Sequence, residues 1–531
     1  MTTTQIAVSA RRADAAVLRR IWRLHFWVGV FAAPALVVLA FSGLVILYSE
    51  PIEAALNRSL LLVSEGPGAI PLDDQVATAR QHVGPGFALD GVAPPAGPGR
   101  STRVDFLAPD APEYPAAESE LTQVFVDPYT GAYLGQRESL SGLVGFANQV
   151  HRMFGNDGPQ VPLPSFGHLI NPEAYPDATI GVGVANLWLE LTAMWILVLL
   201  CTGVYLWWPR AIESVKPLLR VRWGRGGRIR WRDLHASLGI VLSVMLICQI
   251  LSGLTWTRYW GENWRAFSST VAPSLSVDAP STPATMGDYD RLGRRIAWAA
   301  TDDPVYASAP AGPVAAKLSL ADIDRIAKGE NMVPGYLIIP PADSTVDGDT
   351  VYGSYAVVNP WPQRLSEQRT LFLDQFSGKT IANATAAQDG ALARLTSFGI
   401  DMHMGYQLGV LTRITATLAA LGVLAMVATG FLMWWKRRPS GSAGLPGPLN
   451  PKIRAATPKR VVIGVGAAAV VLGVLFPAFG ASVLLVFAVD RLVDRQRRKP
   501  LGDQTAGGIG EHLADADADA DADAAPMTAK R

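Results

Sequence analysis

The chain has 531 residues, of which 49% are hydrophobic and 17% are charged, and its formal net charge at pH 7 is +1. Soluble domains carry about 25% charged residues, so this composition argues against a soluble enzyme. Two cysteines are too few for a disulfide framework. The distribution of charge along the chain, rather than its total, is informative.

Four apolar runs have the length of about 20 residues that crosses the hydrocarbon core of a bilayer. We expect transmembrane helices at residues 25–48, 187–208, 234–256 and 403–435. The first run is longer than the apolar stretch of about 7–15 residues in a cleaved signal peptide. We therefore expect it to remain as an anchor, and the chain to be a multi-pass protein with the lipid bilayer as a partner.

Basic residues predict the orientation of these helices. Arginines and lysines are concentrated in the segments 1–24, 209–233 and 436–460. By the positive-inside rule these three segments are cytoplasmic, as is the N-terminus. The two long segments 49–186 and 257–402 are then external. Because topology already explains the positive charge, we expect no nucleic-acid partner.

A last apolar stretch, residues 461–490, contains Pro477 and Gly480 and has basic residues on both sides. Since both flanks favour the cytoplasm, a membrane hairpin fits this stretch slightly better than a fifth span, and both stay open. The tail at residues 491–531 contains an Ala-Asp repeat and nothing that could form a core. We expect this cytoplasmic tail to be disordered.

The first and third spans share a sequence pattern, as do the second and fourth. In the first and third, a Leu-His pair precedes a Ser-Gly pair at the same separation. In the second and fourth, a Thr-Gly pair precedes two tryptophans. The repeated positions are His25 with Ser42-Gly43, His235 with Ser252-Gly253, Thr202-Gly203 and Thr429-Gly430. Small residues let helices approach closely, which is the simplest explanation of these pairs.

The external segments repeat as well. VFVDPYTGAYLG at 124–135 matches LFLDQFSGKTIA at 371–382, and both read as strand, tight turn and strand. We therefore interpret the chain as an internal duplication of one unit, consisting of a span, a small α+β external domain and a second span. The predicted fold class is an α-helical membrane protein with two small α+β external domains. Parallel repeats of this kind are typically related by a pseudo-two-fold axis along the membrane normal.

Four of the seven histidines form two pairs under this duplication. His25 and His235 begin equivalent spans and can face one another near the cytoplasmic surface. His151 and His403 each follow an external domain and can face one another near the external surface. Two neutral imidazoles across a gap are the ligand set of a six-coordinate haem, and no Cys or Glu joins either pair to complete a zinc site. We expect two b-type haems with these four histidines as iron ligands.

His168 is the alternative to His151 as the external ligand, although the repeat alignment favours His151. His82 and His512 lie outside the repeated pattern and are expected to be bystanders. A haem with two histidine ligands has no open coordination position, so its expected task is the transfer of single electrons.

Together these features resemble the PepSY-associated transmembrane family of bacterial inner-membrane proteins, an iron-regulated group that includes ferrisiderophore reductases. The resemblance is carried by the repeated span motifs, the turns at 127–131 and 374–378, and the FPAFGAS stretch at 476–482. It implies PepSY-like periplasmic domains and electron transfer from an unidentified cytoplasmic donor to a ferric siderophore or other ferric chelate. It also supports the same four histidines as haem ligands. A proline-rich insertion at about 156–180 departs from the family pattern and leaves His168 open.

Two other classes of function remain. A membrane-anchored PepSY protein could bind and inhibit a protease without any redox activity. A permease for an iron chelate or haem would need a polar path, which spans with few polar residues do not provide. The sequence thus favours a di-haem electron carrier that acts as a ferrisiderophore reductase.

Overall fold

The computed structural model describes residues 3–110, 121–153, 159–208, 221–224, 227–275, 277–290, 296–310, 312, 316–360, 362–441, 444–446 and 456–497. The chain divides into two compact units. The helical unit comprises Met1–Ala40, Leu187–Ile250 and Ala419–Arg531, and the sheet unit comprises Phe41–Asn186 and Leu251–Leu418. The predicted disordered tail beyond residue 497, with His512, lies outside the described residues, as does much of the basic segment 209–233.

Four helices of the described residues are long and apolar enough to cross a membrane, so the chain is a membrane protein. They are α1 (Thr3–Leu47), α7 (Val184–Trp207), α8 (Arg228–Leu254) and α12 (Val410–Arg437). The last begins later than the predicted start at residue 403. His403 instead ends a separate helix, α11 (Ala391–His403). Gly405 and Gly409 interrupt the chain between the two helices with φ values of 82° and 60°, which only glycine adopts readily.

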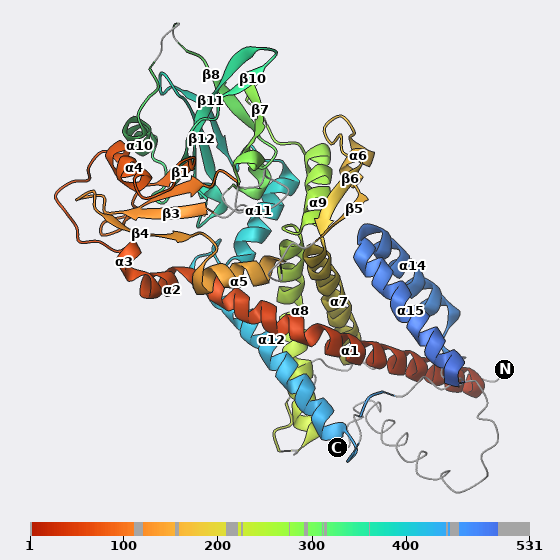
Figure 1. Ribbon diagram of the computed structural model, residues 1–531. Coiled ribbons are helices and arrows are strands. Elements are labelled where there is room, and N and C mark those ends of the chain that lie inside the picture. The colour runs from red at the N-terminus through yellow and green to blue at the C-terminus, as the bar shows by residue number, and fades with distance from the viewer. Residues whose placement is uncertain are drawn as a thin grey trace. The chain divides into compact units, whose positions relative to one another are not determined.

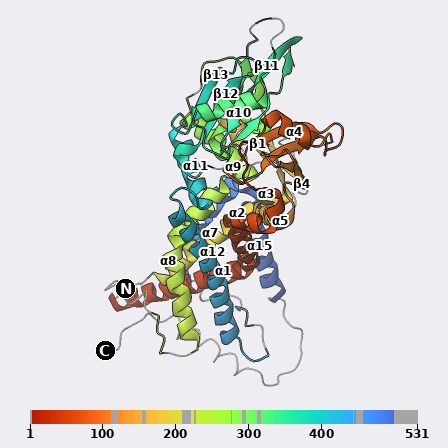
Figure 2. The same cartoon turned by 90° about the vertical axis from the view of Figure 1, so that its left-hand side faces the viewer.

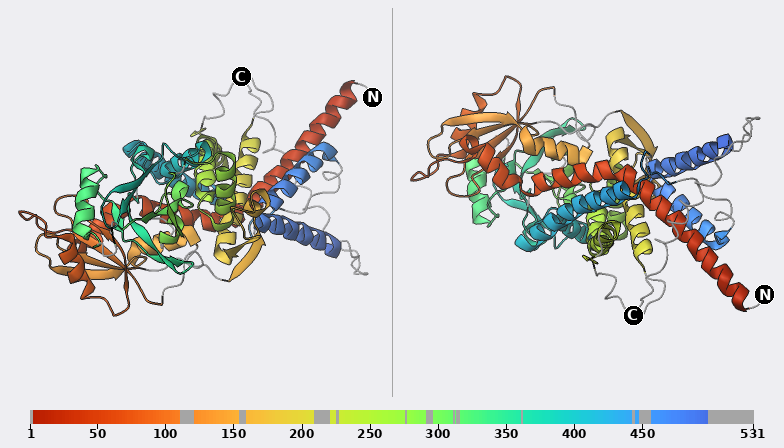
Figure 3. Two further views of the ribbon diagram at one scale, coloured as in Figure 1. Left: turned by 90° about the horizontal axis from the view of Figure 1, so that it is seen from above. Right: turned by 90° about the horizontal axis from the view of Figure 1, so that it is seen from below.

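The C-terminal apolar stretch forms two helices, α14 (Lys459–Leu475) and α15 (Pro477–Arg497). Pro477 suits the first position of a helix, where its missing amide hydrogen is not needed. Gly473 and Gly480 let the two backbones touch, since a Cβ on Gly480 would lie 2.8 Å from the Cα of Gly473. Figure 3 shows the two blue helices meeting at one end. Residues 461–490 therefore have the form of a helical hairpin.

Both long segments between the spans contribute strands to the sheet unit. The sheet has 11 strands, with the main order β13-β12-β11-β9-β1-β2-β3-β4 (Figure 1). The segment before α7 supplies β1 (Ala88–Ala93), β2 (Thr102–Leu107), β3 (Leu121–Val126) and β4 (Tyr133–Glu138). The segment after α8 supplies β7 (Ser281–Thr285), β8 (Pro304–Ser308), β9 (Leu337–Ile339), β10 (Ser344–Val346), β11 (Asp349–Val358), β12 (Arg369–Asp374) and β13 (Thr380–Thr385).

Strands β1 and β9 join the two segments. Val92 pairs with Ile338 across this junction, and both side chains are fully buried. Gly91 permits the close approach, because a Cβ there would lie 2.9 Å from the side chain of Leu337. The sequence predicted two separate small α+β domains, whereas the two segments share one sheet. Pairing removes the exposed apolar edge that each half-sheet would otherwise present.

Helices α4 (Leu72–Arg80) and α10 (Leu320–Gly329) lie side by side on one face of the sheet (Figure 2). The core beneath them mixes side chains from both segments, including Phe106, Val124, Ile323 and Leu371. Alternate residues of a strand face opposite sides. Accordingly, Phe372 packs on the other face, in a second core that includes Met286 and Tyr306.

The two predicted turns have the same construction. The Oδ1 atom of Asp127 accepts a hydrogen bond from the amide of Tyr129 at 2.9 Å, and that of Asp374 accepts one from the amide of Phe376 at 3.0 Å. An aspartate that bonds the backbone two residues later stabilises a tight turn. Each turn ends on a glycine with positive φ, 73° at residue 131 and 69° at residue 378.

The remaining elements are short helices, 3-10 turns and two further strands. They are α2 (Ser49–Leu56), α3 (Arg58–Leu61), α5 (Gly142–Met153), β5 (Gln160–Pro164), α6 (Phe166–Ile170), β6 (Thr179–Gly183), α9 (Arg258–Val271) and the 3-10 turns η2 (Met286–Tyr289), η3 (Trp298–Ala300) and η4 (Leu365–Glu367). Strands β5 and β6 form a separate two-stranded sheet, with β5 inside the predicted insertion and β6 at its end.

Candidate functional site: two histidine pairs

His25 and His235 lie next to each other in the helical unit. His25 belongs to α1 and His235 to α8, and their ring centroids are 6.4 Å apart with the ring planes at 89°. Both side chains are partly buried. Histidines that occupy equivalent places in two similar spans thus come within reach of one shared ligand.

A threonine and a glycine on a neighbouring helix hold each of these rings. His25 Nδ1 lies 3.0 Å from Thr202 Oγ1 on α7, and His235 Nδ1 lies 3.0 Å from Thr429 Oγ1 on α12. The glycine that follows each threonine leaves space for the ring. A Cβ on Gly203 would lie 3.1 Å from His25 Cε1.

The hydroxyl hydrogens of both threonines are already engaged within their own helices. Thr202 Oγ1 donates to the carbonyl of Val198 at 2.8 Å, and Thr429 Oγ1 donates to that of Ala425 at 2.7 Å. Since a hydroxyl has a single hydrogen, each oxygen accepts a hydrogen bond from Nδ1–H of its histidine. A neutral imidazole with its hydrogen on Nδ1 keeps the lone pair on Nε2 free to bind a metal.

His151 and His403 form a matching pair in the sheet unit. Their ring centroids are 6.3 Å apart and the ring planes meet at 76°. His151 lies in α5, and its Nδ1 is 3.0 Å from Ser42 Oγ on α1. His403 ends α11, and its Nδ1 is 3.2 Å from Ser252 Oγ on α8.

Glycines again leave room for the two rings of this pair. A Cβ on Gly43 would lie 3.1 Å from His151 Cε1, and a Cβ on Gly253 would lie 3.0 Å from His403 Cε1. Each of the four histidines therefore rests against a hydroxyl-glycine dipeptide on another helix. We call these four dipeptides the cradles; they are Ser42-Gly43, Thr202-Gly203, Ser252-Gly253 and Thr429-Gly430.

The spacing of both pairs fits one metal ion held between two imidazoles. With metal–nitrogen distances of about 2.0–2.1 Å and each centroid about 1.1 Å behind its nitrogen, the centroids would be about 6.3 Å apart. The observed separations are 6.4 Å and 6.3 Å. Within the described ranges, no group of three or more His, Cys, Asp or Glu side chains could hold a bare metal ion. Two histidines per site instead match the axial ligands of a haem.

The family described as the PepSY-associated TM region matches residues 22–437 of this sequence. The chain belongs to this family. A comparison with curated proteins found no match. The matched region contains both histidine pairs and all four cradles, so the whole candidate site lies within the part that defines a PepSY-associated membrane protein.

His168, the alternative external ligand in this PepSY-associated chain, is engaged elsewhere. It lies in α6, within the insertion, and its Nδ1 is 3.0 Å from the carbonyl oxygen of Tyr175. The ring that stands against His403 is that of His151. The geometry therefore favours His151 as the partner of His403.

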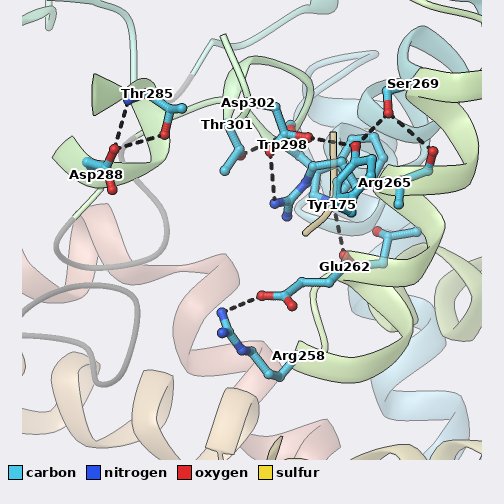
Figure 4. Close-up of polar contacts among 12 residues, drawn as sticks. Tyr175, Arg258, Glu262, Arg265, Ser269, Thr285, Asp288, Trp298, Thr301 and Asp302 are labelled. Carbon is cyan, nitrogen blue, oxygen red and sulfur yellow. Dashed lines mark hydrogen bonds and ion pairs between the residues drawn. The ribbon is translucent and has the colours of Figure 1, made fainter. Parts of the chain in front are cut away.

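The insertion that carries His168 is attached to α9. Figure 4 shows the Tyr175 hydroxyl at Ser269 of this helix, a contact of 2.7 Å. Arg258 of α9 forms an ion pair with Glu262 and also donates from Nε to the carbonyl of Gly181 at 3.5 Å. Burial raises the pKa of Glu262, which the neighbouring arginines partly offset. These contacts explain why His168 stays with its own segment.

Asp401 is the acidic group nearest in sequence to the second pair. Its side chain is buried, and burial raises its pKa to about 7, with a further contribution from the carboxylate of Glu367. Burial also raises the pKa of Tyr406. Near neutral pH, the Asp401 carboxyl is therefore only partly ionised.

His82 takes no part in either pair. Its ring stacks on that of Tyr133, with centroids 3.7 Å apart and planes at 2°. This exposed stack belongs to the surface of the sheet unit. His82 thus serves as an internal comparison for the four paired histidines.

Sequence reasoning explained the four cradles by helix packing and missed their contact with histidine. The signal was present in their chemistry, because each combines a hydroxyl with a glycine rather than two small apolar residues. A hydroxyl and a neighbouring gap suit a polar ring better than another helix backbone. The identity of the histidine in each cradle needed the structure, since the partners lie on different helices.

Proposed function

We propose that this protein is a di-haem electron carrier that reduces ferric siderophore iron, or that of another ferric chelate, on the external side of the bacterial inner membrane. The supporting observation is the separation of the two pairs of imidazole centroids, 6.4 Å and 6.3 Å. Two unrelated residue pairs would not be expected to share the spacing that one bound iron requires. The family resemblance to ferrisiderophore reductases points the same way.

His25 and His235 would hold one haem, and His151 and His403 would hold the other. Bound between them, a haem supplies reversible one-electron chemistry. With two histidines holding each haem, the chain would leave no place on either iron for a chelate. The chelate would then be reduced by transfer of an electron alone, without a bond to the haem iron.

The direction of transfer follows from the charge distribution. The basic segments 1–24, 209–233 and 436–460 support an orientation with the His25 side of the chain toward the cytoplasm. Electrons then enter from a cytoplasmic donor near the first pair and leave near the second.

The reaction outside the membrane is a one-electron reduction of chelated Fe(III) to Fe(II). Fe(II) is the softer ion and binds hard oxygen ligands less tightly, so reduction releases it from a siderophore. The four histidines and their cradles would hold and orient the haems through which electrons pass. No residue of the chain needs to exchange a proton with the chelate.

We also infer that the chain arose by internal duplication. The half-sheet β1-β2-β3-β4 and the half-sheet β9-β11-β12-β13 run outward from their shared junction in the same order. Each is followed by a helix that carries one histidine of the second pair, α5 or α11. Similar spans with similar cradles then continue the correspondence into the helical unit.

The visible spectrum of the purified protein tests this function. We expect the sharp bands of low-spin haem, two haems per chain, and oxidation of the dithionite-reduced protein by a ferric chelate. His25→Ala and His403→Ala should each remove one haem, whereas His82→Ala should remove none. A well-folded but colourless protein would overturn the proposal and favour a PepSY protein that binds or inhibits a protease.

A further inference from the structure

Nδ1 of each paired histidine lies within hydrogen-bond distance of a cradle hydroxyl, at 3.0 Å in three cases and 3.2 Å in the fourth. We propose that the cradle hydroxyls are positioning residues that select the ligating tautomer of each histidine and lower the midpoint potential of the iron it binds. The positioning residues are Thr202 and Thr429, whose own hydrogen bonds make them acceptors, and, by the equivalent contact with Nδ1, Ser42 and Ser252. This inference rests on the proposed haem function.

Selection of the tautomer follows from the hydrogen bonds of the threonines. The Thr202 hydroxyl donates its hydrogen to carbonyls of its own helix, at 2.8 Å and 3.0 Å. Its oxygen therefore faces His25 as an acceptor. Thr429 makes the same contacts at 2.7 Å and 3.1 Å. An acceptor at Nδ1 requires the hydrogen there and leaves Nε2 as the ligating atom. Without the acceptor, the tautomer with hydrogen on Nε2 competes, and it cannot bind iron through Nε2.

The same hydrogen bond affects the electron density at the metal. An oxygen that accepts from Nδ1–H makes the imidazole a more basic ligand. A more basic ligand stabilises Fe(III) relative to Fe(II), and so lowers the midpoint potential. Loss of the acceptor should therefore raise the potential of the haem concerned and leave that of the other haem unchanged.

The cradle also fixes the rotation of each ring. The hydroxyl holds Nδ1 while the glycine lies against Cε1. A Cβ built on each of the four glycines would lie 3.0–3.5 Å from Cε1 of its histidine. These two contacts together prevent rotation about the Cβ–Cγ bond. The resulting angles between ring planes are 89° and 76°. The g-values of ferric low-spin haem depend on this angle, so electron paramagnetic resonance reports on it directly.

The chain offers a matched set of variants on a single helix. Thr202→Val keeps the shape of the side chain but removes the acceptor, and Thr202→Ser restores it. Thr192, also on α7, is fully buried, and its hydroxyl has no hydrogen-bond partner among the residues that the structure describes. Thr192→Val is therefore a control for the same substitution away from the histidine. Ser252→Ala makes the corresponding change at the other pair.

The test is a redox titration and an electron paramagnetic resonance spectrum of each purified variant. We expect Thr202→Val to raise the midpoint potential of one haem, shift its g-values and weaken haem retention by about 10–100-fold. Thr202→Ser should return all three properties toward wild type, and Thr192→Val should change none. Ser252→Ala should change the other haem only, which keeps the test open if Thr202→Val does not fold.

Two failures are distinguishable. If the wild-type protein binds no haem, the proposed function fails. If it binds two haems but both Thr202→Val and Ser252→Ala keep wild-type potentials and g-values, the role of the cradles is overturned while the electron carrier stands.

Discussion

Adding one methyl group at each cradle glycine gives a graded test of the site. The Cβ of an alanine at Gly253 would lie 3.0 Å from His403 Cε1, whereas ordinary contacts begin at 3.4 Å. The ring must therefore move by a few tenths of an ångström. Metal sites tolerate about 0.2 Å in their ligand distances. We expect Gly253→Ala to weaken haem binding by about 10–100-fold, which is about 1.4–2.8 kcal/mol.

The four cradles should not respond equally. Gly43 and Gly203, with Cβ distances of 3.1 Å, should behave like Gly253, but Gly430, at 3.5 Å, should accept alanine with little loss. Gly464→Ala in α14 is the control, because nothing lies within 4 Å of its Cβ position. Alanine favours a helix over glycine by up to about 1 kcal/mol, so general destabilisation of the helices is not expected.

The haem-to-protein ratio of each purified variant, measured as the pyridine haemochrome, gives the result. Gly203→Ala and Gly430→Ala alter the two sides of one histidine pair, so they form the most direct comparison. Equal loss in these two variants, or no loss in Gly253→Ala, would refute the steric reasoning.

Two further predictions concern the sheet unit. Asp73 accepts hydrogen bonds from the amides of Leu320 and Ala321, both at 3.0 Å, so Asp73→Ala should cost about 0.5–2 kcal/mol and speed amide hydrogen exchange at the start of α10. Burial, with the carboxylates of Asp389 and Asp302, raises the pKa of Asp303 to about 7. The folded state therefore has its full stability from this group below about pH 4, where the carboxyl is protonated in both states. That stability is lost as the pH rises through 7, because a buried carboxylate must then be ionised in the folded state. Asp303→Asn should therefore raise the melting temperature relative to wild type at pH 8 but not at pH 4, and the same gain at both would contradict this cause.

The sequence was sufficient to predict the spans and to group the histidines, for a physical reason. Membrane spans need long apolar runs, and a repeated Leu-His motif at equivalent places in two spans leads directly to His25 and His235. The partnership of His151 and His403 followed from the same alignment. These features depend on local composition and on repetition, both of which are visible in one chain.

Other features depend on contacts between distant segments. The pairing of Val92 with Ile338, which turns two predicted domains into one sheet, involves a short strand with no distinguishing pattern. The start of the fourth span was placed too early because Gly405 and Gly409 separate α11 from α12 just before the apolar run. Apolar composition marks a membrane segment, but the end of a helix depends on backbone conformation at single residues.

The number of residues between histidine and cradle in α1 and α8 has a physical explanation, because each helix carries one histidine and also the cradle of another. Helix α1 carries His25 and the cradle of His151, while α8 carries His235 and the cradle of His403. Each residue of an α-helix advances the direction of the side chain by about 100°. A single insertion between histidine and cradle would therefore turn one of them away from its partner. The identical separation in both helices follows from this constraint, because each must present a histidine on one face and a hydroxyl on another.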